Sequence, residues 1–257
     1  MPVFDTIGRW FLTFFQATGQ IVLFGGRAVI ASFSGPVYWR ALGSSLLKIG
    51  FHSLPVVGLT AVFTGAALAL NIYDGSARFN AETFLPQILS VSIVRELGPG
   101  FAALMVAGRS SSAMAAELGA MRVSDQIDAM STLAVDPFKY LVAPRVLATT
   151  LMLPFLVLVA DIIGILGGWL VAVYALDFDG ITFVRAIDSF LTLGDVTSGL
   201  LKAGVFGFLI SVMGCYFGYR SSGGAQGVGG STRSAVVASA VAILASNYVM
   251  TSLMVGI

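Results

Sequence analysis

The segment that decides the fold is residues 95–145, RELGPGFAALMVAGRSSSAMAAELGAMRVSDQIDAMSTLAVDPFKYLVAPR. It begins inside an apolar run that contains two adjacent charges, Arg95 and Glu96. After Gly108 the sequence becomes polar, and an apolar run resumes only at Val146. A polar segment of this length between two apolar runs predicts two membrane spans joined by a segment on which another molecule docks.

The composition of the whole chain supports this membrane interpretation. Of 257 residues, 57% are hydrophobic and 11% are charged, whereas soluble domains carry about 25% charged residues. The net charge of +1 gives no basic footprint for nucleic acid. A single cysteine, Cys215, excludes a disulfide within the chain and a multi-cysteine metal site. We therefore expect an all-α integral membrane protein that binds neither metal nor nucleic acid.

Residues 1–40 predict helices at the membrane surface. Residues 3–18 place apolar side chains on one face of a helix, which is typical of an amphipathic helix in the interface plane. Residues 21–33 are apolar but short and are interrupted by Gly25 and Gly26. This second pattern predicts an elbow helix rather than a span.

Five apolar runs are long enough to cross a bilayer as helices. They cover residues 49–70, 84–108, 146–176, 196–219 and 234–257. The third run is longer than a span needs, so it must be tilted, broken at Pro154 or extended beyond the bilayer. Lys and Arg concentrate before the first run and after the second and fourth runs. This bias predicts a cytoplasmic N-terminus, a cytoplasmic segment 109–145 and a periplasmic C-terminus.

Arg95 and Glu96 are the first candidate functional residues. A charge at membrane depth is costly unless it faces a cavity or a partner. Adjacent helical residues point in different directions, so these two cannot pair with each other. Pro99 cannot donate to the carbonyl of Arg95, which predicts a bend and one freed acceptor. Two interpretations stay open: the residues line a cavity, or they form structural ion pairs with another helix or chain.

The polar segment 109–145 predicts two short helices. The first covers residues 111–121, and the second runs from Asp125 to about Leu133 with Ser124 as its N-cap. Both contain methionine and alanine expected on the surface, where a solvated loop would have more Lys and Glu. We favour a docking surface for a soluble partner over that loop.

Glycine patterns give two further predictions. Residues 224–231, GAQGVGGS, have the outline of a phosphate-binding loop, but Gly230 stands where that motif needs a lysine. We predict a flexible loop over residues 220–233 and no means of hydrolysing ATP in this chain. Two pairs of glycines spaced by four predict close helix packing, within one subunit or between two; they are Gly164 with Gly168 and Gly214 with Gly218. The sequence has no catalytic constellation, so we expect no enzyme.

Several motifs together resemble the MlaE family, the permease subunits of bacterial lipid-transporting ABC systems, which have chloroplast relatives. They are RELGP (95–99), AGR (107–109), AAELGAMRVSDQIDAM (115–130) and AVDPFKYLVAPR (134–145). The resemblance is strongest over residues 88–175. It implies a homodimer that encloses a phospholipid cavity near Glu96, flanked by Arg95 and Pro99. It also implies a coupling element for a cytoplasmic ABC ATPase, carried by Glu117, Met121, Arg122, Asp125 and Asp128.

The same resemblance implies the remaining partners and the function. A STAS-domain protein is expected on the ATPase, and a periplasmic MCE-domain hexamer on the outer face. ATP would be bound by the partner ATPase, so this chain needs no cofactor. The expected function is to move phospholipids between the inner membrane and the MCE carrier, which maintains outer-membrane lipid asymmetry. Three alternatives remain open: another hydrophobic cargo such as sterols, a non-transporting scaffold, or an ion-coupled carrier.

Overall fold

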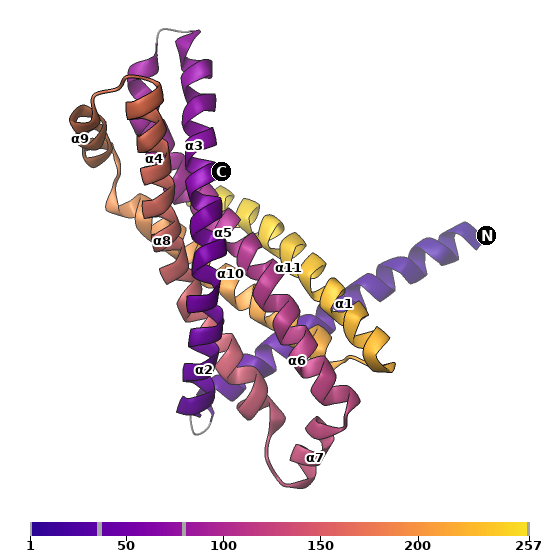
Figure 1. The fold of residues 1–257 in the computed structure, drawn as a ribbon. Helices are drawn as coiled ribbons and strands as arrows, with labels where there is room; N and C mark the ends of the chain where they lie inside the picture. Colours follow the sequence, from indigo (N-terminus) through magenta and orange to yellow (C-terminus); the bar gives the residue numbers. More distant parts are fainter. Residues whose placement is uncertain (1, 35–37, 79–80, 256–257) are drawn as a thin grey trace.

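The computed structural model describes residues 2–34, 38–78 and 81–255, which form a helical bundle without strands in these ranges (Figure 1). This confirms the all-α prediction. Six stretches of the described chain are long and apolar enough to cross a membrane. The α-helices are α1 (Pro2–Phe33), α2 (Trp39–Ile49), α3 (Leu54–Ala77), α4 (Leu85–Ser92), α5 (Gly98–Val106), α6 (Ser112–Val123), α7 (Gln126–Thr132), α8 (Ala143–Ala175), α9 (Gly180–Phe190), α10 (Leu193–Tyr219) and α11 (Gly224–Val255).

Shorter helical segments connect several of these helices. Two are 3-10 helices, η1 (Phe51–Ser53) and η2 (Glu82–Phe84). Three are π-helical, η3 (Ile93–Leu97), η4 (Ala107–Ser111) and η5 (Phe138–Val142). Such π turns often occur at functional sites, and η3 contains both Arg95 and Glu96.

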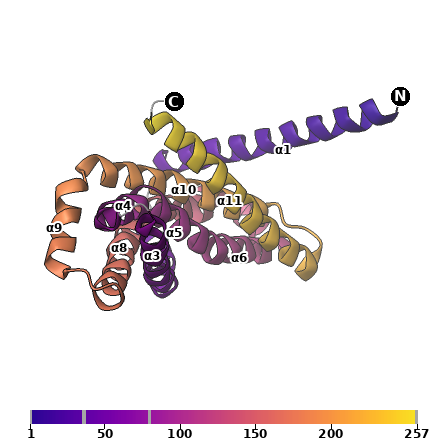
Figure 2. The same cartoon turned by 90° about the horizontal axis from the view of Figure 1, so that it is seen from above.

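Helices α8 and α10 form the centre of the bundle. Helix α3 packs on α8, while α6 and α11 pack on α10 (Figures 1 and 2). Leu153 of α8 and Phe206 of α10 are fully buried there. Large apolar side chains also point outward, including Phe63 of α3 and Phe155 of α8. An exposed apolar surface of this extent is expected where lipid is the solvent.

Glycines let the central helices approach closely. A Cβ added to Gly65 of α3 would lie 1.9 Å from the carbonyl oxygen of Gly164 in α8. A Cβ on Gly218 of α10 would lie 2.9 Å from the Cα of Ala115 in α6. The glycine pairs in the third and fourth predicted spans therefore serve packing within one chain.

The second predicted span and the start of the docking segment form one helical stretch. Helix α4 continues through η3, α5 and η4 into α6, so the chain stays helical from Leu85 to Val123. The predicted change of structure at Gly108 is absent because η4 carries the helix through it. Pro99 lies in the first turn of α5, where a missing N–H is tolerated.

The N-terminal region differs from its prediction. Residues 2–33 form the single helix α1, where the sequence predicted an interfacial helix followed by an elbow. Gly25 does not break the helix, because its bare face lies against Val212 of α10. The N-terminal half of α1 extends away from the bundle in both views (Figures 1 and 2). Phe11–Phe33 is the sixth candidate span, and the placement of α1 in the interface stays a prediction.

The predicted glycine-rich loop is mostly helix. Helix α11 begins at Gly224, so the loop 220–233 shrinks to residues 220–223. Gly223 and Gly224 adopt φ values of 86° and 68°, which glycine tolerates at no steric cost. Residues 224–231 consequently form the first turns of a helix and not a phosphate-binding loop.

The two predicted loops on either side of the second and third spans are also shorter than the sequence indicated. Helix α3 extends to Ala77, beyond the predicted end at Leu70. The predicted loop before the fourth span contains α9, which Asp179 caps by accepting a hydrogen bond from the amide of Thr182 at 2.8 Å. Hydrogen bonds from Thr182 hold the pKa of the Asp179 carboxyl below its usual range.

Helix α8 passes through Pro154 unbroken. Its 33 residues span about 50 Å, more than a bilayer core of about 30 Å.

Candidate functional site

The first candidate site is a charged cluster between three elements, formed by Glu96, Lys202, Asn247 and Thr251. We call it the Glu96 cluster. The Lys202 ammonium of α10 lies 2.6 Å from Oε1 of Glu96 in η3. From α11, Asn247 Nδ2 donates to Oε2 of Glu96 at 3.0 Å, and the Thr251 hydroxyl lies 3.0 Å from Oε1. One carboxylate thus joins η3 to α10 and α11.

Lys202 is the most buried charge of this cluster. Only 2% of its side chain is exposed, against 37% for Glu96. Its ammonium also donates to the carbonyl of Arg95 at 3.0 Å and to the Thr251 hydroxyl at 2.8 Å. The acceptor that Pro99 was predicted to free at Arg95 is therefore present, and Lys202 binds it. Each of the three N–H donors of the Lys202 ammonium therefore has an acceptor, which a buried charge requires.

Arg95 points into a different environment. Its Nε lies 3.4 Å from Oδ1 of Asp195, in the first turn of α10. The prediction that Arg95 and Glu96 need separate partners is confirmed. Pro99 is buried, and its ring lies 3.4 Å from where a Cβ on Gly199 would be. Both charges thus form ion pairs within the chain, and their role beside a lipid cavity stays a prediction.

The sequence did not indicate Lys202, Asn247 or Thr251 as partners of Glu96. The available signal was Lys202 itself, the only lysine within the fourth predicted span. Two opposite charges at membrane depth in different spans need each other. The two polar residues of α11 gave no such signal, because single Asn and Thr side chains are common in membrane helices.

The second candidate site is the corner between α6 and α7, formed by residues 122–128. Arg122 Nη1 lies 2.5 Å from Oδ1 of Asp128. Asp125 is the N-cap of α7 with a φ of 57° and makes no side-chain cap bond. Ser124, the predicted N-cap, instead ends α6 and donates to the carbonyl of Ala120. The structure thus brings three of the five predicted coupling residues together.

The other two coupling residues lie elsewhere. Met121 is partly buried against the hydrophobic core, and Glu117 faces α2 and α8. Met114 is buried and Met130 packs on the same core. The prediction of exposed methionines is therefore wrong for Met114, which is buried, while Met121 and Met130 are partly buried against the core. Leu133, 76% exposed, is the large apolar side chain that stands out at this end.

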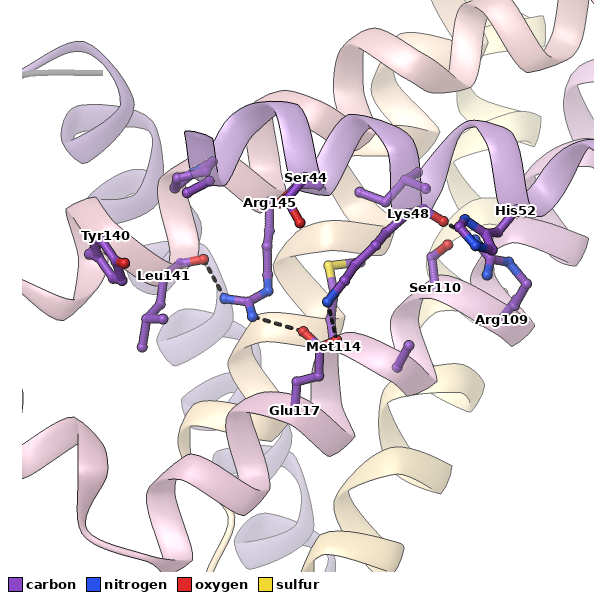
Figure 3. Close-up of a pocket in the computed structure, with 15 residues that line it drawn as sticks. Ser44, Lys48, His52, Arg109, Ser110, Met114, Glu117, Tyr140, Leu141 and Arg145 are labelled. Atoms are coloured by element: carbon purple, nitrogen blue, oxygen red, sulfur yellow. Dashed lines mark hydrogen bonds and ion pairs between the residues drawn. The ribbon is translucent and has the colours of Figure 1, made fainter. Parts of the chain in front are cut away.

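A third site is a pocket of about 370 Å³ between α2, α6 and α8, which we call the interhelix pocket (Figure 3). Lys48 of α2 and Arg145 of α8 both point at Glu117 of α6 and lie 2.9 Å from its two carboxylate oxygens. Arg109 lies at the other end, where its Nε donates to the Ser53 hydroxyl at 3.0 Å and its Nη2 to the carbonyl of Lys48.

His52 and Cys215 make ordinary structural contacts. His52 Nδ1 lies 3.3 Å from the carbonyl oxygen of Leu47, and its ring contacts Phe51. Cys215 is fully buried. Within residues 2–34, 38–78 and 81–255, no three His, Cys, Asp or Glu side chains gather as metal ligands would.

The fold and these sites define a class of protein: a multi-pass α-helical membrane protein with an ion pair buried between its helices. The family model described as "Permease MlaE" matches residues 42–253. The chain therefore belongs to the MlaE permease family.

Curated relatives match almost the whole chain. A "Probable ABC transporter permease protein" of Rickettsia felis is 49% identical over 98% of both chains. The "Intermembrane phospholipid transport system permease protein MlaE" of Haemophilus influenzae is 31% identical over 98% of this chain and 97% of its own. "Protein TRIGALACTOSYLDIACYLGLYCEROL 1, chloroplastic" of Arabidopsis thaliana is 37% identical over 91% of this chain and 67% of its own.

Proposed function

We propose that this chain is the permease subunit of an ABC transporter of the bacterial inner membrane. It moves phospholipids between that membrane and a periplasmic MCE-domain carrier, and so maintains outer-membrane lipid asymmetry. The observation that carries the proposal is the Glu96 cluster, an ion pair shared by three helical elements in a member of this family. The name of the Haemophilus influenzae relative supports phospholipid as the cargo.

The Glu96 cluster suits a site that opens and closes. A phosphate that reaches the cluster would compete with Glu96 for the Lys202 ammonium. Such an exchange would require α10 or α11 to move relative to η3, because Glu96 holds both helices. Arg95, held by Asp195 nearby, would supply a second cation. Pro99 would fix the bend at which these groups meet.

The energy for this movement would come from a partner. We place a cytoplasmic ABC ATPase on the corner of α6 and α7, where Arg122, Asp125 and Asp128 lie together and Leu133 is exposed. A STAS-domain protein would bind that ATPase. The distribution of Lys and Arg in the sequence supports a cytoplasmic N-terminus and a periplasmic C-terminus, and the MCE hexamer would sit on the outer face.

A second copy of the chain would complete the cavity. Helix α11 buries one side against α6 and α10 and leaves apolar residues on the other. Val237, Val241, Leu244 and Tyr248 are exposed on that outer side. A homodimer that pairs these faces would put two Glu96 clusters around one lipid path.

The test is ATP-dependent transfer of a fluorescent phospholipid from proteoliposomes that contain the whole complex. The variant is Glu96→Leu with Lys202→Met, which removes both charges at once. The matched control, Asp74→Ala with Arg78→Ala, removes an exposed ion pair of 3.2 Å. Because a hydrogen bond to a charged group is worth about 1.5–3 kcal/mol, we expect transfer to fall about tenfold or more in the variant and to stay unchanged in the control.

The same preparation distinguishes the alternatives. Mass spectrometry of the co-purified lipids should find less phospholipid in the double variant. Unchanged lipid content and unchanged transfer would reduce the Glu96 cluster to a structural ion pair. Sterol in place of phospholipid would assign another cargo, and no ATP-dependent transfer by the parent complex would indicate a scaffold.

A further inference from the structure

The interhelix pocket is a second charged site, separate from the Glu96 cluster and outside the proposed transport path. Three cationic side chains, Lys48, Arg109 and Arg145, line it with a single acid, Glu117. We propose that this pocket binds a phosphate group, and that Glu117 is the internal counterion which the phosphate displaces.

Glu117 makes the contacts that a phosphate group in this pocket would make. Its two oxygens each accept one charged hydrogen bond of 2.9 Å, from Lys48 and from Arg145 (Figure 3). Cations that hold a carboxylate through separate oxygens can hold two phosphate oxygens in the same way. Lys48 is 61% exposed and Glu117 is 42% exposed, whereas Arg145 is 15% exposed. The Glu117 side chain can therefore swing aside, which leaves the Lys48 ammonium for the phosphate, while Arg145 remains as the fixed anchor.

Arg145 is held in place from the other side. Its Nη1 donates to the carbonyl of Leu141 at 2.7 Å. Arg109 is similarly fixed by Ser53 and by the carbonyl of Lys48. These bonds use two of the five N–H donors of Arg109, which leaves donors for a ligand. Two oriented guanidinium groups that line one pocket are typical of phosphate recognition.

A further polar group on the wall lacks a protein partner. The Ser110 hydroxyl is buried and has no hydrogen-bond partner among the residues that the structure describes. Ser110 lines the pocket next to Arg109. A buried hydroxyl normally has a partner, and a bound anion would provide an acceptor. The volume of about 370 Å³ falls within the range of roughly 300–1,000 Å³ for ligand pockets.

Exposed apolar side chains begin close to the pocket. On α8, the first large exposed apolar residue after Arg145 is Leu151, six positions or about 9 Å further along the helix. On the neighbouring element, Phe51 is exposed only three positions after Lys48. The headgroup layer extends about 5–8 Å beyond the hydrocarbon core on each side. A phosphate in the pocket would therefore have its acyl chains beside this apolar surface.

The test measures binding of dioleoyl phosphatidic acid to the purified full-length chain by native mass spectrometry, without nucleotide or partner. Dioleoylglycerol, with the same acyl chains and no phosphate, is the comparison ligand. Loss of one charge-assisted hydrogen bond corresponds to roughly a tenfold change in affinity. We expect Lys48→Gln to weaken phosphatidic acid binding about tenfold. We expect Glu117→Gln to strengthen it, because the competing carboxylate is removed. Arg78→Gln, an exposed cation at the other end of α3, should change nothing.

The source of the phosphate is decided by adding inorganic phosphate. If millimolar phosphate displaces the lipid, the pocket takes free phosphate; if it does not, the pocket takes a lipid headgroup. Equal binding of phosphatidic acid and dioleoylglycerol would overturn the proposal, and so would a Glu117→Gln variant that binds phosphatidic acid no better. A purely structural salt bridge predicts this last result together with a lower unfolding temperature. None of these outcomes depends on ATP-driven transfer. The binding assay therefore tests the phosphate pocket independently of the proposed transport function.

Discussion

Lys202 places its ammonium 2.6 Å from the carboxylate of Glu96, and the two residues differ greatly in burial. The lysine side chain is 2% exposed and the glutamate is 37% exposed. A buried charge that loses its partner costs far more than a charge that water can reach. The pair is therefore asymmetric, and substitutions on its two sides should not be equivalent.

The first prediction follows from this asymmetry. Glu96→Leu leaves a buried ammonium without its carboxylate and should destabilise the chain by about 3–5 kcal/mol. Lys202→Met leaves a partly exposed carboxylate and should cost clearly less. The double variant should recover most of the loss, because no unpaired charge remains. Thermal unfolding in nanodiscs measures all three, and equal losses for the two single variants would contradict the asymmetry.

A second prediction concerns the contact between α3 and α8. Gly65→Ala places a methyl group 1.9 Å from the backbone of Gly164, so the helices must separate. We expect a loss of about 1–3 kcal/mol in the free energy of unfolding. Gly75→Ala lies on the same helix and meets nothing within 4 Å; it should be neutral or slightly stabilising. Similar unfolding temperatures for the two variants would show that the helices can adjust.

The third prediction tests the corner of α6 and α7 as the ATPase dock. Asp125→Arg reverses an exposed charge at the turn and should lower the amount of ATPase that co-purifies with the chain. Asp125 makes no side-chain cap bond, so the isolated chain should lose only the cost of about 1 kcal/mol of placing arginine at a φ of 57°. Asp188→Arg on α9 is the matched control at the opposite end. Full ATPase stoichiometry in Asp125→Arg would place the dock elsewhere.

The fourth prediction concerns how α1 is attached. Phe24 packs on Phe138 and Tyr216, with ring centroids 5.0 and 5.6 Å apart. Removing a buried aromatic ring costs about 3–5 kcal/mol, so Phe24→Ala should release α1 from the bundle. Hydrogen exchange of the α1 amides should rise strongly in that variant. Val22→Ala, an exposed neighbour, should leave exchange unchanged; a similar rise in both would mean that α1 is held by lipid alone.

Much of the fold could be predicted from the sequence. Apolar length located the long helices α3, α8, α10 and α11, and the need for two environments separated the partners of Arg95 and Glu96. The missing N–H of Pro99 correctly indicated a free acceptor at the carbonyl of Arg95, which Lys202 binds. These predictions rest on local rules: hydropathy, helical geometry and the missing N–H of proline.

The errors arose where packing overrides local propensity. Glycine-rich residues 224–231 are helical although glycine has a low helix propensity; this end of α11 packs on α6 through Val228, which lies 3.3 Å from where a Cβ on Gly119 would be. The family resemblance placed Glu117 and Asp125 on one coupling element, which stays a prediction, but the sequence did not indicate that Lys48 and Arg145 from other helices bind Glu117. Asn247 and Thr251 could not be assigned to Glu96 without knowing which helix faces meet.

Two π-helical segments, η3, which contains Glu96, and η4, fix an angular relationship between Glu96 and the side chains of α6. Each π turn contains one residue more than an α-helical frame needs, so it rotates everything that follows by about 100°. The segments η3 and η4 lie within one continuous helical stretch. They therefore set the direction in which the α6 side chains face relative to the ion pair of Glu96 and Lys202. Conversion of either segment to α-helix would turn Glu117 away from Lys48 and Arg145 without bending the helix. The two extra residues therefore set the rotation of α6 about the helix axis relative to Glu96, while the stretch 85–123 stays one continuous helix.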